Sequence, residues 1–574
     1  MEKQSLAWKV AGAAGEGIMT TGLLLSKTFA RHGWYIFDYT EYPSLIRGGH
    51  NTYQIHTAKN PVFAQKSKVD VLVALNKDGL TLHQSELSQT SAVIYDSEHD
   101  KIDATEFNLR GKLFNLPMRS LAKEAGTDEV MANNVALGAS IYLLGLDLLI
   151  FNQVIADVFA NKGEKIISLN QRAAQFGYNY FKDREKPIFA VDKQELNHLT
   201  MTGNEAIALG ALAGGLQFYA AYPMTPSSSI LHYLAKNAHI TGTVVKHAED
   251  EISVINMAIG ASFAGVRSMV GTSGGGFCLM VEALGLAGIC ELPIVIFEGQ
   301  RPGPALGLPT WSDQGDLKFV LSASHGEFPR FVLAPGDAKE GFELSRKAQI
   351  LAETYQTPVI LLSDKYLSES RFSLEIETET YSNSRFGIEN QPKLDKTGFF
   401  PRYRADTPIG PRTIPGTIDG IYIANADDHD QYGLSAEESD VRTAQVNKRN
   451  KKMESMKMEI PKQYFEEDPQ ATLTFISFGS TKGAIKAARE MLSASGILTS
   501  HLNLSWLWPF PKDQVKTVLE KPENVVIVEG NSEGQLANLI AQETGFMAKY
   551  KLNRYDGRPF FAEEIVDFAR SFVK

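Results

Sequence analysis

Short apolar runs alternate with helical repeats along most of this chain of 574 residues. Near the N-terminus, the apolar run 7–11 is followed by a glycine-rich turn and then by residues 18–32, where apolar side chains recur at helical spacing. The same order of strand, turn and helix returns over residues 205–362 and again over 472–529. Strands that alternate with helices are typical of parallel sheets covered on both faces, so the pattern predicts a multidomain α/β protein.

The pattern divides the chain into four segments, in keeping with a length that is too great for one core. We expect α/β domains over residues 1–190, 191–368 and 466–574. Residues 369–465 are rich in Pro, Gly, Asn, Asp and charge, which predicts an extended connection that wraps other domains. We expect the basic run 448–452 within it to be a solvated helix face.

Composition and charge exclude several classes of protein. A net charge of −10 argues against a nucleic-acid binder, because neutralising phosphates requires a basic face. The chain has two cysteines, Cys278 and Cys290, which excludes a disulfide scaffold and fits a reducing cytosol. Two cysteines are also too few to hold an iron–sulfur cluster. We expect both to be small buried residues and the protein to be cytoplasmic. The longest apolar stretch, 135–151, is shorter than the roughly 20 residues that span a bilayer, so we expect a buried helix and no membrane partner.

Three separated motifs in the middle of the chain each follow an apolar strand, and ligands of open α/β sheets bind at the carboxyl ends of strands. The first motif, residues 222–228, reads YPMTPSS. Its two prolines fix the backbone around Thr225 and present the hydroxyl rigidly. Ser227 or Ser228 is expected to cap the next helix. The alternative is a capped strand-to-helix turn with no ligand.

The second motif contains Glu251, which opens an almost wholly apolar helix. We expect its carboxyl group to face a dry environment, where a carboxylic acid has a raised pKa and can share a proton. Glu249 is a competing candidate two residues earlier. The alternative is a carboxylate that only stabilises the start of the helix.

The third motif is the loop around Arg301, which follows the predicted strand 294–298. A guanidinium group there can clamp a carboxylate through paired hydrogen bonds. The alternative is a surface arginine paired with Glu298 or Asp313. The glycine-rich turn 271–276 permits close approach of the backbone to a ligand.

The N-terminal turn 12–17 is spaced G-x-x-G-x-G, which matches neither a dinucleotide fingerprint nor a P-loop. A glycine turn that opens a helix can still bind a phosphate, although Glu16 counts against one. Arg47 lies in a second glycine-bearing loop and is a candidate for meeting an anion.

Together these motifs resemble the large subunit of the 2-oxoacid:ferredoxin oxidoreductases in which gamma and alpha parts are fused. Residues 12–22, 47–49 and 133–138 resemble the gamma unit, and the middle motifs resemble the pyrimidine-binding domain of thiamine diphosphate enzymes. Residues 508–511 and 529–531 resemble the transketolase C-terminal domain.

The resemblance implies roles for named residues. Thr225 is expected to contact the 2-oxoacid, Arg301 to bind its carboxylate and Glu251 to activate thiamine diphosphate. The gamma unit is associated with coenzyme A, which implies a cofactor-binding role for three residues there, Gly15, Gly17 and Arg47.

The family keeps its diphosphate and magnesium site on a Gly-Asp-Gly motif, and its [4Fe-4S] cluster on grouped cysteines, and this chain has neither. The resemblance therefore implies a separate beta subunit that carries thiamine diphosphate, Mg and [4Fe-4S], with no metal ligand in this chain. It also implies ferredoxin as electron acceptor and a dimer of alpha-beta heterodimers.

The implied reaction is the reversible, coenzyme A-dependent oxidative decarboxylation of a 2-oxoacid. The stretch 302–310 favours 2-oxoglutarate, with succinyl-CoA as product, and a branched-chain 2-oxoacid or pyruvate is the alternative. A transketolase-like or 2-oxoacid dehydrogenase component would need its own diphosphate motif or a lipoyl partner. In a non-catalytic, ligand-binding regulatory subunit, the three middle residues would be structural.

Overall fold

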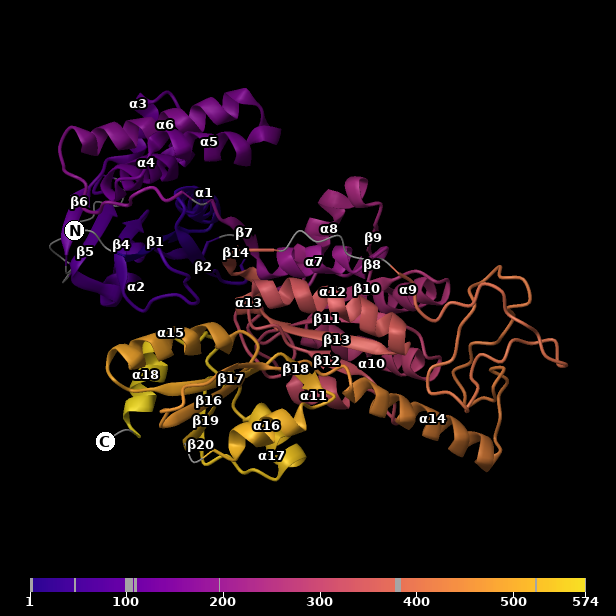
Figure 1. Cartoon of the computed structure of the whole chain (residues 1–574). Coiled ribbons are helices and arrows are strands. Elements are labelled where there is room, and N and C mark those ends of the chain that lie inside the picture. Colours follow the sequence, from indigo (N-terminus) through magenta and orange to yellow (C-terminus); the bar gives the residue numbers. More distant parts are fainter. Residues whose placement is uncertain are drawn as a thin grey trace. The chain divides into compact units, whose positions relative to one another are not determined.

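The computed structural model describes residues 4–45, 48–98, 107, 111–195, 197–376, 384–521 and 524–572. The chain forms two compact units (Figure 1). The first unit comprises Met1–Met201, Glu369–Glu375 and Phe561–Glu564, and the second comprises Thr202–Ser368, Ile376–Phe560 and Ile565–Lys574. None of the helices formed by the described residues combines the length and apolar character that a bilayer crossing needs.

The first unit contains one eight-stranded sheet, in the order β6-β5-β4-β1-β3-β2-β14-β7. Its strands are β1 (Ser5–Ala13), β2 (Tyr35–Glu41), β3 (His50–Ala58), β4 (Val69–Ala74), β5 (Leu87–Tyr95), β6 (Lys112–Asn115), β7 (Leu199–Thr202) and β14 (Arg371–Leu374). β4, β5 and β6 continue parallel from β1, but β3 runs antiparallel to both β1 and β2. The prediction of a parallel sheet is therefore wrong for half of this unit. The sequence of β3 is too polar to be recognised as a strand, and β3 pairs antiparallel with β2 directly after it in the chain.

The helices of this unit are α1 (Ile18–Arg31), α2 (Lys77–His83), α3 (Met118–Glu124), α4 (Ala132–Leu144), α5 (Leu148–Val158) and α6 (Glu164–Lys182). The apolar stretch expected to be one helix is two, α4 and α5. The backbone of Gly145 is left-handed (φ 71°) and ends α4. Asp147 then starts α5 by accepting a 2.8 Å hydrogen bond from the Leu149 amide.

The second unit contains a seven-stranded sheet in the order β18-β12-β13-β11-β10-β8-β9, parallel except for β18. Its strands are β8 (Phe218–Ala221), β9 (Val244–His247), β10 (Ser268–Thr272), β11 (Ile294–Gln300), β12 (Phe331–Leu333), β13 (Pro358–Asp364) and β18 (Trp506–Trp508). α9 (Glu251–Phe263), α10 (Gly274–Ile289) and α11 (Leu317–Ser322) pack on one face. α7 (Gly203–Ala213), α8 (Ser228–Thr241) and α12 (Ala338–Tyr355) pack on the other, and α13 (Lys365–Glu369) follows β13. The strands and helices predicted around the three middle motifs are confirmed.

A five-stranded sheet follows, in the order β15-β17-β16-β19-β20. It is formed by β15 (Tyr464–Glu466), β16 (Leu473–Phe478), β17 (Thr499–Leu504), β19 (Asn524–Glu529) and β20 (Tyr550–Asn553), with α15 (Thr481–Ala494), α16 (Lys512–Leu519), α17 (Gln535–Thr544) and α18 (Ala562–Arg570). Gln314 ties this sheet to the loop after β11. Its side chain donates to the Phe478 carbonyl (3.0 Å) and accepts from the Gly530 amide (2.8 Å).

Residues 384–438 contain no helix or extended strand and lie along the second unit as loops (Figure 1). Arg402 and Arg412 are buried there and donate to the carbonyls of Glu291 (3.0 Å) and Ser262 (2.8 Å). These arginines fasten the loops to the ends of α9 and α10, and a wrapping connection over residues 369–465 stays a prediction.

The basic run 448–452 lies on α14 (Ser439–Lys457), but the expected solvated face is wrong for Lys448 and Lys452. Both are buried and both pair with the buried carboxylate of Glu291, Lys452 at 2.6 Å. These cations hold the pKa of Glu291 below its ordinary value against the opposing effect of burial. The expectation of two buried cysteines is half correct, since Cys290 is buried and Cys278 is exposed.

Candidate active site

The motif residues of the second unit lie at one edge of its seven-stranded sheet. Thr225 follows β8, Glu251 follows β9, Gly274 follows β10 and Arg301 follows β11. These four strands are neighbours and run parallel. Their carboxyl ends therefore share an edge, which is where open α/β sheets bind ligands.

Arg301 and Thr225 are in direct contact. The guanidinium group of Arg301 donates a 2.8 Å hydrogen bond to the Thr225 carbonyl. The neighbouring Pro226 packs against Gly299, where a side chain would come within 2.8 Å of the proline ring. Asn204 holds the same turn by donating to the Pro226 carbonyl (2.7 Å). The two loops are thus positioned together by packing and by hydrogen bonds.

The prediction that a serine side chain caps α8 is wrong. Ser227 is the N-cap residue of α8, yet its side chain makes no capping hydrogen bond. Its hydroxyl instead donates to the Met224 carbonyl at 2.7 Å. The Ser227 side chain therefore stabilises the turn before α8 and does not cap that helix.

Glu251 is the buried one of the two candidate glutamates. It begins α9 and is 4% exposed, whereas Glu249 is exposed. Asp250 caps the helix by accepting from the Ser253 amide at 2.7 Å, so the cap does not use Glu251. The Oε1 atom of Glu251 is buried and has no hydrogen-bond partner among the described residues.

The first turn of α10 lies against the Glu251 carboxylate. A Cβ atom at Gly276 would stand 2.5 Å from Glu251 Oε1 and closer still to Thr272 Oγ1. Only glycine leaves room there for both oxygens. The glycine-rich turn after β10 thus lets the backbone approach a carboxylate closely, which its sequence alone could not specify.

Arg301 is half-buried, and burial lowers its pKa while Glu298 and Asp316 oppose that shift. No ion pair within 4 Å joins it to Glu298 or Asp313 among the described residues. The alternative of a paired surface arginine is therefore not what the structure shows. The remaining donors of Arg301 are available for an anion at the sheet edge.

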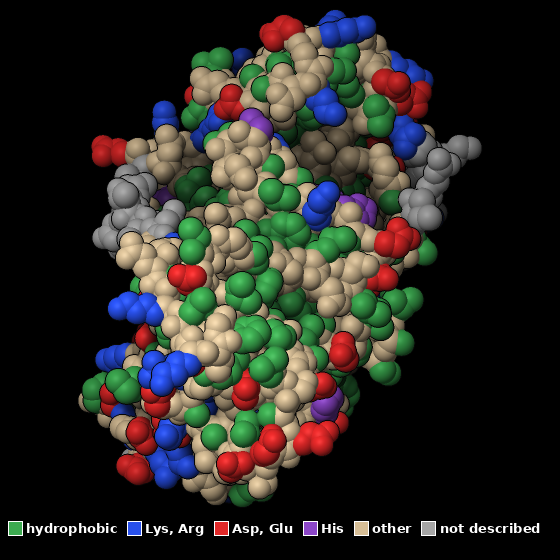
Figure 2. All heavy atoms as spheres, turned by 90° about the vertical axis from the view of Figure 1, so that its right-hand side faces the viewer, with side chains coloured by type: hydrophobic (Ala, Val, Ile, Leu, Met, Phe, Trp, Pro, Cys, Tyr) green, Lys and Arg blue, Asp and Glu red, His purple; other side chains and the backbone are tan. Residues whose placement is uncertain are grey.

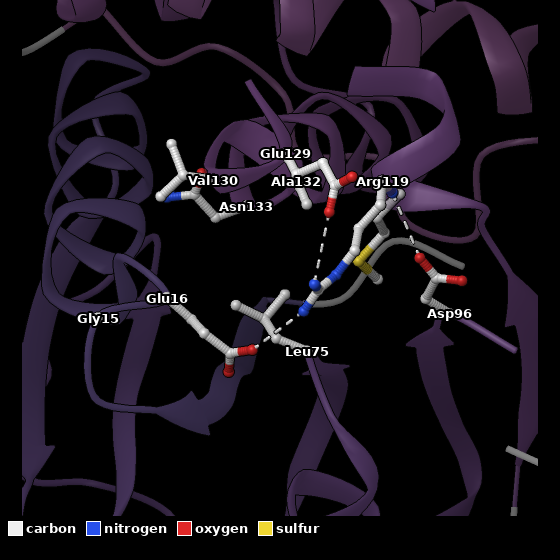
Figure 3. Close-up of a pocket in the computed structure, with 10 residues that line it drawn as sticks. Gly15, Glu16, Leu75, Asp96, Arg119, Glu129, Val130, Ala132 and Asn133 are labelled. Carbon is white, nitrogen blue, oxygen red and sulfur yellow. Dashed lines mark hydrogen bonds and ion pairs between the residues drawn. The ribbon is translucent and has the colours of Figure 1, made fainter. Parts of the chain in front are cut away.

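Gly15 and Gly17 lie in the first unit, at the carboxyl end of β1. Both have left-handed backbones (φ 98° and 77°), and the side chain of Asn133 occupies the space beside Gly17. Gly15 lines a cavity of about 200 Å³ between the ends of β1 and α4 (Figure 3). Arg47 lies outside the described residues.

The cavity is lined by three acidic residues, Glu16, Asp96 and Glu129, and one basic residue, Arg119. Glu16 accepts from the Ala13 amide (2.6 Å), so the chain's own carboxylate takes an amide that a phosphate would need. Arg119 is the cation of the cavity and lies 3.6 Å from Glu16 and 3.8 Å from Glu129 (Figure 3). Sequence reasoning missed Arg119, because nothing near it in the chain marks it as a ligand.

Comparison with known proteins finds relatives that match this chain over nearly its whole length. Three family profiles match in succession: "Pyruvate ferredoxin/flavodoxin oxidoreductase" over residues 7–180, "Pyruvate flavodoxin/ferredoxin oxidoreductase, thiamine diP-bdg" over 209–455 and "Pyruvate:ferredoxin oxidoreductase core domain II" over 471–565. The chain is 30% identical to 2-oxoacid:ferredoxin oxidoreductase 2, subunit alpha, of Aeropyrum pernix, over 98% of this chain and 97% of that protein.

Two further relatives carry 2-oxoglutarate in their names. The 2-oxoglutarate oxidoreductase subunit KorA of Mycobacterium tuberculosis is 30% identical over 99% of this chain and 91% of its own. The solved 2-oxoglutarate:ferredoxin oxidoreductase of Magnetococcus marinus, with 2-oxoglutarate, coenzyme A and succinyl-CoA bound, is 31% identical, covers both chains fully and has a TM-score of 0.91.

Proposed function

The chain belongs to the 2-oxoacid:ferredoxin oxidoreductase family, and from that premise we propose that it is the large subunit of an enzyme that oxidises 2-oxoglutarate. Coenzyme A and ferredoxin are the co-substrates, and succinyl-CoA and CO2 are the products. The observation that carries the proposal is the buried, unpartnered Oε1 of Glu251 at the sheet edge that also holds Arg301. The 2-oxoglutarate named for two relatives supports this choice of 2-oxoacid.

Glu251 fits a thiamine diphosphate cofactor. A buried carboxylate oxygen without a partner is stabilised by a nitrogen that donates to it or shares its proton, as an aminopyrimidine ring does. When bound, the cofactor supplies a nucleophilic carbon for decarboxylation. Glu251 would hold and move a proton at Oε1, and the glycine turn around Gly276 would keep that oxygen in place.

Arg301 and Thr225 fit the substrate. One guanidinium nitrogen is already held by the Thr225 carbonyl, which orients the group. The other N–H groups would bind the carboxylate of the 2-oxoacid, in the paired geometry that arginine offers. The same contact brings Thr225 beside the substrate.

We infer that a beta subunit completes this site and brings Mg and [4Fe-4S]. α9 and α10 expose Ile252, Met257 and Leu279 by 53%, 45% and 50%, and Glu282 is the one charged side chain that these fully described helices expose. Figure 2 views the molecule from the right-hand side of Figure 1, where α9 and the loops of residues 384–438 lie, and shows many hydrophobic side chains on that side. An apolar surface that begins at Glu251 suits a stable protein partner.

Coenzyme A is proposed to use the first unit, with Gly15 and Gly17 at its site; Arg47, which lies outside the described residues, is proposed as a further contact. The 200 Å³ cavity beside Gly15 accommodates part of such a ligand, and Arg119 is the cation it offers. Glu129 is partly exposed, so an incoming phosphate can replace it beside Arg119.

The test is the substitution Glu251→Gln in the complex purified anaerobically with its partner subunit. Loss of the proton-sharing group should lower kcat for coenzyme A-dependent oxidation of 2-oxoglutarate by about 10²-fold to 10⁴-fold. Glu249→Gln is the matched control at an exposed position and should keep activity. An active Glu251→Gln enzyme, or a chain that purifies with no thiamine-binding partner, would contradict the proposal.

A further inference from the structure

Glu298 is a fully buried carboxyl group at the floor of the proposed active site. It lies on β11 in register with Thr272 of β10, two residues from the end of its strand. Its neighbour Phe297 points into the core on the α7 and α8 side. Because side chains alternate along a strand, Glu298 points to the opposite side, toward the first turn of α10.

Ionising the Glu298 side chain would carry a large cost in free energy, because the group is buried away from water. Glu298 is 0% exposed, and neither of its oxygens has a hydrogen bond of ordinary geometry among the described residues. The group that it faces is another carboxyl group, Asp316, and Asp364 of β13 is a further carboxyl group that acts on it. Burial first, and Asp316 next, raise the pKa of Glu298 well above its ordinary value. Arg301 is a cation on which both carboxyl groups act.

Asp316 is the less buried member of the pair; burial raises its pKa, and the neighbouring Glu298 and Arg301 oppose that shift. It is half-buried, and its carboxylate fills the space that a side chain would need at Gly274, the first residue of α10. A carboxylate at a helix N-terminus is favoured by the helix dipole. Its backbone amide donates to Gln300 Oε1 at 3.0 Å, which fixes the loop beside the end of β11.

We propose that Glu298 is a positioning residue that keeps its proton and shares it with Asp316, so that one negative charge, and not two, stands behind Arg301. The shared proton lets two carboxyl groups lie together in a buried place. With both ionised, they would compete with the substrate carboxylate for the guanidinium group. The inference rests on the proposed role of Arg301 in binding that carboxylate.

The first experiment measures the proton directly. Infrared spectra of the assembled complex at neutral pH should contain a protonated-carboxyl C=O band that is lost in Glu298→Gln. The exposed Glu343→Gln on α12 is the control and should keep the band. A spectrum in which Glu298→Gln removes no such band would overturn the inference, even if every variant were active.

The second experiment separates positioning from folding. Glu298→Gln keeps a neutral group and should leave KM for 2-oxoglutarate within about threefold, because one bond of this kind changes little when its polarity is preserved. Glu298→Ala opens a cavity under Arg301 and should raise KM about tenfold or more, with a smaller change in kcat. Equal damage by Gln and Ala would overturn the inference.

Arg301→Lys distinguishes this inference from the function on which it rests. If Arg301→Lys leaves KM unchanged, the substrate role of Arg301 fails and the proposed site with it. If Arg301→Lys raises KM but Glu298→Gln loses no infrared band, only the inference about the proton fails.

Discussion

Gly276→Ala tests whether the close approach of α10 to Glu251 matters for activity. The new Cβ would stand 2.5 Å from Glu251 Oε1, whereas non-bonded atoms settle at roughly 3.5 Å, so the carboxylate has to move by about 1 Å. A 1 Å misplacement of a catalytic group lowers the rate by about 10²-fold. We therefore expect kcat for 2-oxoglutarate oxidation to fall by about that factor.

The assay is coenzyme A-dependent reduction of ferredoxin by the reconstituted complex, with thermal unfolding as the check on folding. Gly275→Ala is the matched control on the same turn, because its Cβ would meet only the Ala305 carbonyl at 3.6 Å, an ordinary contact. Helix propensity predicts a stability change within about 1 kcal/mol for this control. If Gly276→Ala is as active as Gly275→Ala, the argued placement of Glu251 is wrong.

Two further predictions concern buried charge. Lys452→Met removes one cation from the buried Glu291 and should lower the free energy of unfolding of the second unit by about 3 kcal/mol, measured by chemical denaturation. The control Lys451→Met, at an exposed neighbouring position, should change it by less than about 0.5 kcal/mol. Equal effects of the two substitutions would refute the role of the ion pair. Burial raises the pKa of Asp38 to about 7, although Tyr53 donates to it at 2.6 Å. The folded chain therefore keeps a proton that the unfolded chain loses, so stability falls by up to about 4 kcal/mol as pH rises from about 4 to 7. Asp38→Asn should remove that slope from thermal unfolding, and an unchanged slope would refute the assignment.

Much of the proposed site could be predicted from the sequence because it depends on local pattern. Apolar strands followed by glycine, proline or a helix start place Thr225, Glu251 and Arg301 at the ends of strands, and parallel strands bring those ends to one edge. The resemblance to the family chose Glu251 over Glu249, and the structure adds the physical difference, since Glu251 is buried and Glu249 is exposed.

The sequence by itself determined the α/β class and the succession of elements, because the periods of helices and strands are written in consecutive residues. Only the tertiary structure decided that β3 returns antiparallel, that Lys452 pairs with Glu291 and that Glu298 faces Asp316. These partners are distant along the chain or belong to different elements. Their pairing depends on which helix and strand faces pack together in the folded protein. Burial at these contacts then decides whether an ionisable side chain is charged and paired, shares a proton or stays neutral.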